Sequence, residues 1–132
     1  MVRVARLHRS MKDRVHRVGR FRFLKGGAFV GTFNKVHAAV VCPRCGAEGV
    51  AELELRLGNT ANMRDLRVGD LYPWVPGEPP ENGGRPEGGN VDGDGYMECE
   101  HCRKDSFHFV TIREDVINGI APNRYKEPYI TD

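Results

Sequence analysis

The sequence has no long hydrophobic run. None of its apolar stretches approaches the roughly 20 residues that a helix needs to cross a bilayer. The basic N-terminus is followed by FLKGGAFVG, in which Lys25 and the glycines interrupt the apolar core that a secretory signal requires. We therefore expect a chain that is not exported and stays in the reducing cytoplasm. There, disulfides are disfavoured, and cysteines serve metal or redox chemistry instead.

The sequence also lacks the motifs of common catalytic sites. H-E-x-x-H, G-x-S-x-G, a P-loop and a dinucleotide-binding G-x-G-x-x-G are all missing, and KGGAFVG carries no Walker lysine. No nucleophile and base can be paired from the sequence, so we predict no catalytic residue and no residue that binds an organic cofactor. A non-enzymatic protein is the main expectation, and an enzyme or enzyme subunit on the same scaffold is an alternative.

The charge of the chain is divided unequally along its length. The 132 residues fit one domain. Residues 1–25 hold nine Lys or Arg and one acid, a net +8, whereas residues 26–132 hold eleven bases and seventeen acids, a net −6. Any attraction to phosphate would therefore come from the N-terminal segment rather than from the body.

The first 25 residues predict a basic amphipathic helix or arm. Val4, Leu7, Met11, Val15 and Val18 are spaced 3, 4, 4 and 3 residues apart, which places them on one helical face, and arginines fill the others. Three interpretations are open. The apolar face docks on the body, the basic face binds a membrane, nucleic acid or an acidic partner, or translation starts at Met11.

The remainder, residues 26–132, predicts a small antiparallel β domain. Residues 33–41 and 105–112 are rich in β-branched and aromatic residues, and residues 51–57 alternate leucine with Glu52 and Glu54, which predicts a strand with one wet face. Asn118 and Gly119 predict a tight hairpin turn. Residues 76–95 hold seven glycines and four prolines, which predicts a flexible loop.

Four cysteines stand in two C-x2-C pairs, Cys42 with Cys45 and Cys99 with Cys102. Each pair can place two sulfurs on one side of a tight turn, and two such turns supply four thiolates in a tetrahedron. We predict that these four residues bind zinc, with iron as the alternative, because soft thiolates accept both metals. A shell of four cysteines leaves no position for substrate, so the site would be structural.

The pattern resembles the zinc-ribbon and rubredoxin-like modules, whose two zinc knuckles are C-x2-C turns at the tips of hairpins. CPRCG matches the first knuckle, and Gly46 can take a left-handed conformation there. CEHCR departs from the pattern because Arg103 replaces the glycine. The resemblance implies a small zinc-ribbon-like sheet with zinc between the knuckles.

Other interpretations use the same residues. CPRC resembles a thioredoxin-type redox motif, but a strand follows it where that motif needs a helix. Residues 90–101 resemble a calcium-binding loop, except that His101 stands where a bidentate Glu is required. His37 and His108 lie on predicted strands near the knuckles. Each could support the metal site or catalysis, but a packed strand residue is the simpler interpretation.

These observations together predict a non-enzymatic zinc module that mediates interactions. The acidic body favours a protein partner, and nucleic acid bound through residues 1–25 is the alternative. A small redox or electron-transfer protein that uses the C-x2-C pairs with iron or as thiols is a second functional class.

Overall fold

A computed structural model describes residues 31–130 of the protein. The predicted basic helix in residues 1–25 lies outside the described residues. Within residues 31–130, no helix is long and apolar enough to span a bilayer.

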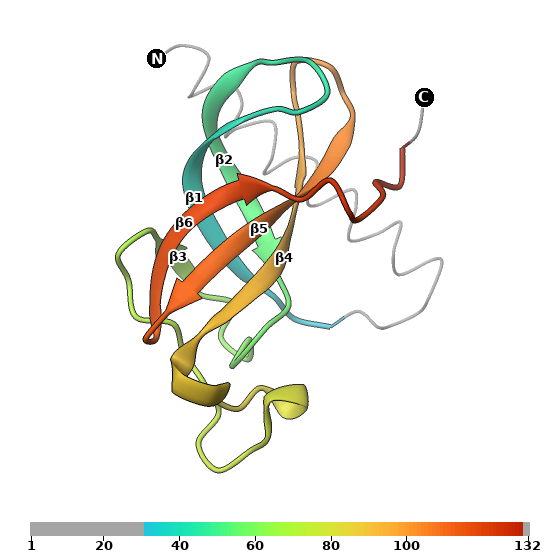
Figure 1. The fold of residues 1–132 in the computed structure, drawn as a ribbon. Helices are drawn as coiled ribbons and strands as arrows, with labels where there is room; N and C mark the ends of the chain where they lie inside the picture. The colour runs from blue at the N-terminus through green and yellow to red at the C-terminus, as the bar shows by residue number, and fades with distance from the viewer. Residues whose placement is uncertain (1–30, 131–132) are drawn as a thin grey trace.

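The described chain is mainly β, as predicted, and forms one curled sheet of six strands (Figure 1). The order in the sheet is β3-β1-β2-β4-β5-β6; only the pairing of β3 with β1 is parallel. The strands are β1 (Asn34–Val41), β2 (Glu48–Leu55), β3 (Asp65–Arg67), β4 (Val91–Glu98), β5 (Asp105–Arg113) and β6 (Val116–Pro122). Two short 3-10 helices, η2 (Pro80–Asn82) and η3 (Glu87–Gly89), precede β4.

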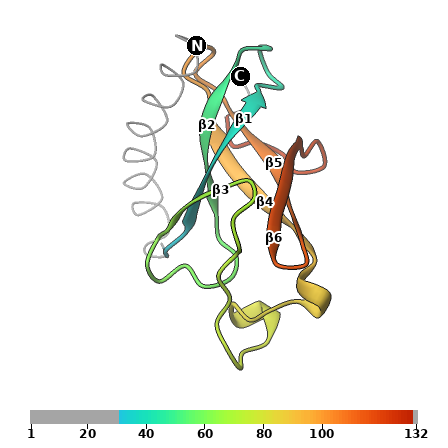
Figure 2. The same cartoon turned by 90° about the vertical axis from the view of Figure 1, so that its left-hand side faces the viewer.

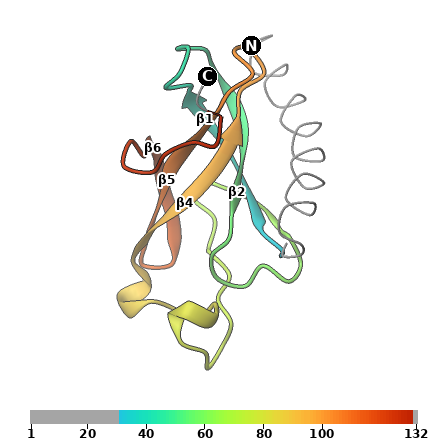
Figure 3. The same ribbon diagram turned by 90° about the vertical axis from the view of Figure 1, so that its right-hand side faces the viewer.

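The core lies on the concave inner face of the sheet. Alternate residues of each strand point inward, and the sheet curls until β1 approaches β6 (Figures 2 and 3). The fully buried members of this core include Val36, Leu53, Met97, Val110 and Ile112. The strands predicted at 33–41, 51–57 and 105–112 are therefore confirmed, within small shifts of their ends.

The two halves of the sheet are joined unevenly. The β1–β2 hairpin and the β4–β5 hairpin each pair over eight residue pairs. The halves meet through β2 and β4, which pair only at Glu54 with Tyr96 and at Leu55 with Gly95. Toward the hairpin tips, backbone pairing does not connect β2 to β4.

The predicted loop at residues 76–95 is shorter in the structure, because Val91 to Gly95 belong to β4. The glycines that suggested a loop have a packing role here. A Cβ on Gly93 would lie 2.8 Å from Leu55 Cδ1, and a Cβ on Gly95 would lie 3.0 Å from Val110 Cγ2. Glycine at these positions lets neighbouring strands bring large side chains across the inner face of β4.

Residues 76–90 form a folded segment at the end of the sheet opposite the cysteines (Figure 1). The Val75 N–H donates to Gly83 O at 2.8 Å, and the Gly84 N–H donates to Pro79 O at 2.9 Å. Arg85 Nε donates to Asp115 Oδ1 at 2.7 Å, and Trp74 Nε1 donates to the same oxygen at 2.9 Å. Asp115 thus ties this segment to the β5–β6 hairpin.

The hairpin turn predicted at Asn118 and Gly119 is wrong, because both residues lie inside β6. The chain turns instead at Glu114 and Asp115, whose φ values are 49° and 72°. Two positive φ values are what a type I′ turn requires. The local strain at Asp115 is offset by its hydrogen bonds with Trp74 and Arg85, which the sequence pattern does not reveal.

The predicted wet face of β2 is also wrong. Glu52 and Glu54 do point away from the leucines, but they are only 3% and 2% exposed. The alternation therefore identifies a strand correctly without identifying which face meets water.

Replacing Gly84 with alanine tests whether residues 76–90 are fixed in solution. An alanine Cβ would overlap the carbonyl oxygen of Glu78, so the backbone must move. We expect Gly84→Ala to cost about 1–3 kcal/mol of unfolding free energy, measured by thermal or urea denaturation. Gly119→Ala is the matched control, since no atom lies within 4 Å of its Cβ position. Equal melting of both variants would show that the segment is mobile.

Candidate metal centre

The two C-x2-C pairs lie at the tips of the two long hairpins. Cys42 directly follows β1 and Cys45 lies in the β1–β2 turn, while Cys99 directly follows β4 and Cys102 lies in the β4–β5 turn. Figures 1, 2 and 3 show both hairpin tips at the same end of the sheet. The topology therefore joins residues that are about 60 positions apart in the chain.

The four sulfurs form one compact group, in which all Sγ atoms lie within 4.8 Å of one another. Cys42 Sγ is 3.8 Å from Cys102 Sγ, and Cys45 Sγ is 3.8 Å from Cys99 Sγ. A tetrahedral zinc with Zn–S bonds of about 2.3 Å places its ligand sulfurs about 3.8 Å apart. A disulfide would need about 2.05 Å. The donor set and its spacing fit a tetrahedral metal ion.

The two turns have the same backbone architecture. In the first, the Cys42 N–H donates to Ala47 O and the Gly46 N–H donates to Cys42 O, each at 2.8 Å. In the second, the Cys99 N–H donates to Lys104 O and the Arg103 N–H donates to Cys99 O, also at 2.8 Å. The residue after each second cysteine is left-handed, with φ 82° at Gly46 and 66° at Arg103. Arg103 therefore adopts the glycine conformation despite its side chain.

Burial and contacts between the thiols shift the pKa values of Cys42, Cys99 and Cys102 in different directions when no metal is bound. Cys42 and Cys99 are buried, whereas Cys45 is exposed. A hydrogen bond from the Cys99 thiol lowers the pKa of Cys42 to about 5, and the same contact, together with burial, raises the pKa of Cys99. Burial also raises the pKa of Cys102. A metal ion that binds four thiolates must therefore displace protons from Cys99 and Cys102 at neutral pH.

Arg44, inside the first turn, connects the cysteine cluster to the C-terminal residues. Its guanidinium donates to Asp105 O and to Ile130 O, both at 2.8 Å, and Nη1 lies 3.7 Å from Asp105 Oδ1. The buried Asp105 carboxylate accepts hydrogen bonds from the Tyr129 and Ile130 N–H groups. The sequence does not reveal this connection, because Arg44 and Asp105 are 61 positions apart and the C-x2-C motif that contains Arg44 gives no sign of a contact with Asp105.

The other predicted candidates lie outside the sulfur cluster. His101 is exposed on the second turn. His37 Nε2 lies 2.8 Å from Asp65 Oδ1 on the outer face of the sheet. His108 is 1% exposed within the core, where burial lowers its pKa to about 4 and its Nε2 lies 3.1 Å from Ser106 Oγ. Neither His37 nor His108 belongs to the group of metal-ligating side chains that the cysteines form.

The calcium-loop interpretation is contradicted by the structure, because Asp92 and Asp94 lie in β4 rather than in a loop. Their carboxylates pair with cations instead. Asp92 Oδ1 lies 3.0 Å from Arg113 Nη2, and Asp94 Oδ2 lies 3.9 Å from Lys126 Nζ. The thioredoxin-type interpretation of CPRC also loses its basis, since β2 follows the motif in place of a helix.

Comparison with known proteins adds no family to this picture: no protein-family model, curated protein or solved structure matches the chain.

The two turns offer a matched pair of substitutions at equivalent backbone positions. Gly46→Ala introduces a Cβ into open space, so it tests the positive φ alone, and we expect a loss of about 1 kcal/mol of unfolding free energy. Arg103→Gly should raise the unfolding free energy by a few tenths of a kcal/mol to about 1, because it relieves the same strain. Urea denaturation of the metal-loaded protein measures both. Changes of the same sign in the two variants would contradict the equivalence of the turns.

Proposed function

We propose that Cys42, Cys45, Cys99 and Cys102 bind one zinc ion and that this ion is structural. The observation that carries the proposal is the group of four sulfurs within 4.8 Å, with 3.8 Å between sulfurs of opposite turns. Four thiolates complete the tetrahedral shell of zinc and leave no position for substrate. The two equivalent turns also support the likeness to zinc-ribbon modules. In this protein the turns belong to a six-stranded sheet, which extends well beyond the two hairpin tips.

The proposed zinc has a mechanical role that follows from the sheet. β2 and β4 share only two residue pairs, so the tips of the two hairpins have few backbone hydrogen bonds between them. An ion bound by both tips closes this open end and contributes its binding energy to folding. Iron would fit the same sulfurs, and its visible absorbance distinguishes it from colourless, redox-silent zinc.

Removing the metal tests this role. The purified protein is expected to carry one equivalent of zinc and no visible absorbance. Stripping it with a strong chelator should lower the melting temperature by at least about 10 °C, since each kcal/mol is worth several degrees in a domain of this size. The variant Cys42→Ser/Cys99→Ser is the control, and its melting should not respond to the chelator. Less than half an equivalent of metal with titratable thiols, or an unchanged melt after verified removal, would contradict the proposal.

Beyond the metal, we propose a non-enzymatic cytoplasmic module that binds a protein partner. The acidic body supports this choice, and four thiolates with one divalent ion would add a further net −2. Several apolar side chains outside the core support it too, among them Leu71, which is 72% exposed, and Val68, which is 48% exposed. Both follow the short edge strand β3, where a protein partner could cover them.

A titration with DNA separates the protein-binding proposal from the nucleic-acid alternative. For a 30-base-pair duplex at about 0.15 M salt, we expect binding by fluorescence anisotropy no tighter than about 1 µM, the range of non-specific attraction. This residual binding should weaken with salt and disappear when residues 1–20 are deleted. Tight binding that persists in this deletion variant would show instead that the body itself recognises nucleic acid.

A further inference from the structure

Residues 123–130, which follow β6, cross the outer face of β4 and β5 and are called the C-terminal strap here. The first anchor of the strap is the buried Asn123, which donates from its N–H to Phe107 O at 2.9 Å and from Nδ2 to Asp94 Oδ1 at 2.8 Å. The next four residues are all exposed, and the Tyr125 side chain is 91% exposed. The middle of the strap therefore contributes little burial, and its position depends mainly on the contacts at its two ends.

The second anchor of the strap joins both cysteine turns. Asp105, the first residue of β5, is fully buried, and its carboxylate accepts hydrogen bonds from the Tyr129 and Ile130 N–H groups at 2.8 and 3.0 Å. Arg44, from the first cysteine turn, donates to Asp105 O and to Ile130 O, both at 2.8 Å. Arg44 Nη1 also lies 3.7 Å from Asp105 Oδ1, so a cation from the other hairpin faces the buried carboxylate. This anchor therefore requires the two hairpin tips to lie close together.

The proposed metal ion would hold the same two tips. Sulfurs from opposite turns lie 3.8 Å apart, whereas β2 and β4 share only two residue pairs. Without the ion, few backbone contacts keep the tips together, and their separation would move Arg44 away from Asp105. A buried carboxylate that loses its cation is costly, so the second anchor is the contact most sensitive to loss of the metal.

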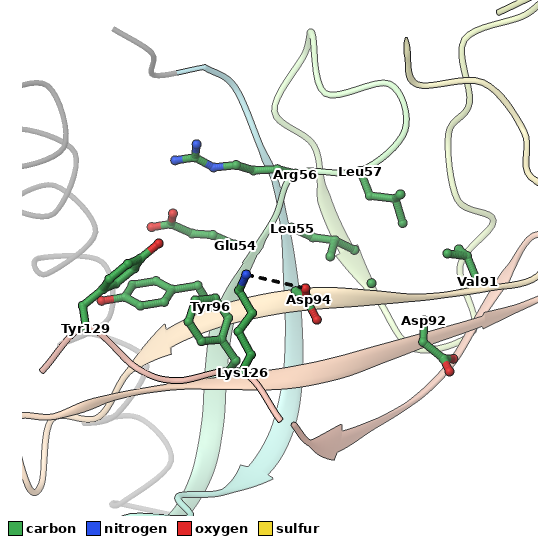
Figure 4. Close-up of a pocket in the computed structure, with 12 residues that line it drawn as sticks. Glu54, Leu55, Arg56, Leu57, Val91, Asp92, Asp94, Tyr96, Lys126 and Tyr129 are labelled. Atoms are coloured by element: carbon green, nitrogen blue, oxygen red, sulfur yellow. Dashed lines mark ion pairs between the residues drawn. The ribbon is translucent and has the colours of Figure 1, made fainter. Parts of the chain in front are cut away.

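The strap also forms part of the wall of a cleft of about 430 Å³ (Figure 4). The Tyr129 ring lies against Tyr96 and Phe107, with ring centroids 5.6 and 5.8 Å apart. Lys126 Nζ lies 5.0 Å from the centroid of the Phe107 ring. Tyr96 and Phe107 are only 8% and 7% exposed in this arrangement. Displacement of the strap would therefore widen the cleft and expose both rings.

We propose that the C-terminal strap is a latch that the metal centre controls. With the metal bound, the cysteine turns keep Arg44 and Asp105 together, and the strap covers Tyr96 and Phe107. Loss of the metal opens the second anchor, frees residues 124–130 and exposes the two rings, while the first anchor stays in place. The latch rests on the proposed structural zinc and goes beyond it, because it links metal binding to a change in the surface of the protein.

Backbone ¹⁵N relaxation of the full-length protein, measured by NMR with and without zinc, tests the latch. With zinc bound, the N–H groups of Tyr129 and Ile130 should be as rigid as the sheet, with order parameters of about 0.85, and after chelation these values should fall below about 0.6. Tyr72 and Ile117, whose N–H groups are hydrogen-bonded at the opposite end of the sheet, are the references and should stay near about 0.85. Zinc content and free thiols are measured in each sample, below the melting temperature of the metal-free protein.

A substitution in the first cysteine turn separates the latch from the metal itself. Arg44→Gln keeps all four cysteines but removes the cation of the second anchor, so Tyr129 and Ile130 should become mobile even with zinc bound. Because coupling is reciprocal, a chelator should remove zinc from this variant at a concentration at least about fivefold lower than from the wild type. His101→Gln changes the exposed residue at the equivalent position of the second turn and should behave like the wild type.

Four results would overturn the latch. A strap that stays rigid after verified zinc removal, or in zinc-loaded Arg44→Gln, would show that the metal and Arg44 do not control it; a lower melting temperature without zinc would still support the structural ion. An equal fall of the order parameters at Tyr72 and Ile117 would show unfolding of the whole sheet. A mobile strap in the zinc-loaded wild type would show that the latch does not close. A protein that binds no metal would overturn both proposals, and the zinc content identifies that case.

Discussion

The approach of the two cysteine pairs is the interaction on which the rest of the structure depends. The hairpins that carry them are each well paired, but β2 and β4 meet only at Glu54 with Tyr96 and at Leu55 with Gly95. Backbone hydrogen bonds therefore join the two halves near the middle of the sheet. At the hairpin tips, side chains make the contacts between the halves. Bringing four thiolates together there requires the loss of thiol protons and the closure of long loops. A bound metal ion would offset both of these costs in free energy.

The opposite end of the sheet is held by different chemistry. Asp115 accepts hydrogen bonds from Trp74 and Arg85 and occupies a left-handed position in the β5–β6 turn. The glycine-rich segment before β4 is thereby attached to the hairpin at its far end. One end depends on sulfur and a candidate metal, and the other depends on a carboxylate with two donors. The apolar inner face lies between them and supplies the core.

The distribution of charge shapes how the domain can act. The sheet carries three buried carboxylates, Glu52, Glu54 and Glu98, on the face turned away from the core. Next to the candidate metal centre, Arg44 donates hydrogen bonds to Asp105 O and Ile130 O, so Ile130 is held at the same end of the sheet as the sulfurs.

The sequence by itself identified the four cysteines that come together and the main strands, because both depend on local chemistry. C-x2-C spacing constrains two sulfurs within one turn, and the alternation around Leu53 reflects the two faces of a strand. Contacts between distant residues were decided only by the tertiary structure. The turn lies at Asp115 and not at the predicted Asn118, because Trp74 and Arg85 stabilise that position. Gly93 lies in a strand and not in the predicted loop, because Leu55 packs across it. The same holds for the buried glutamates, since alternation separates two faces but only tertiary packing determines which of them meets water.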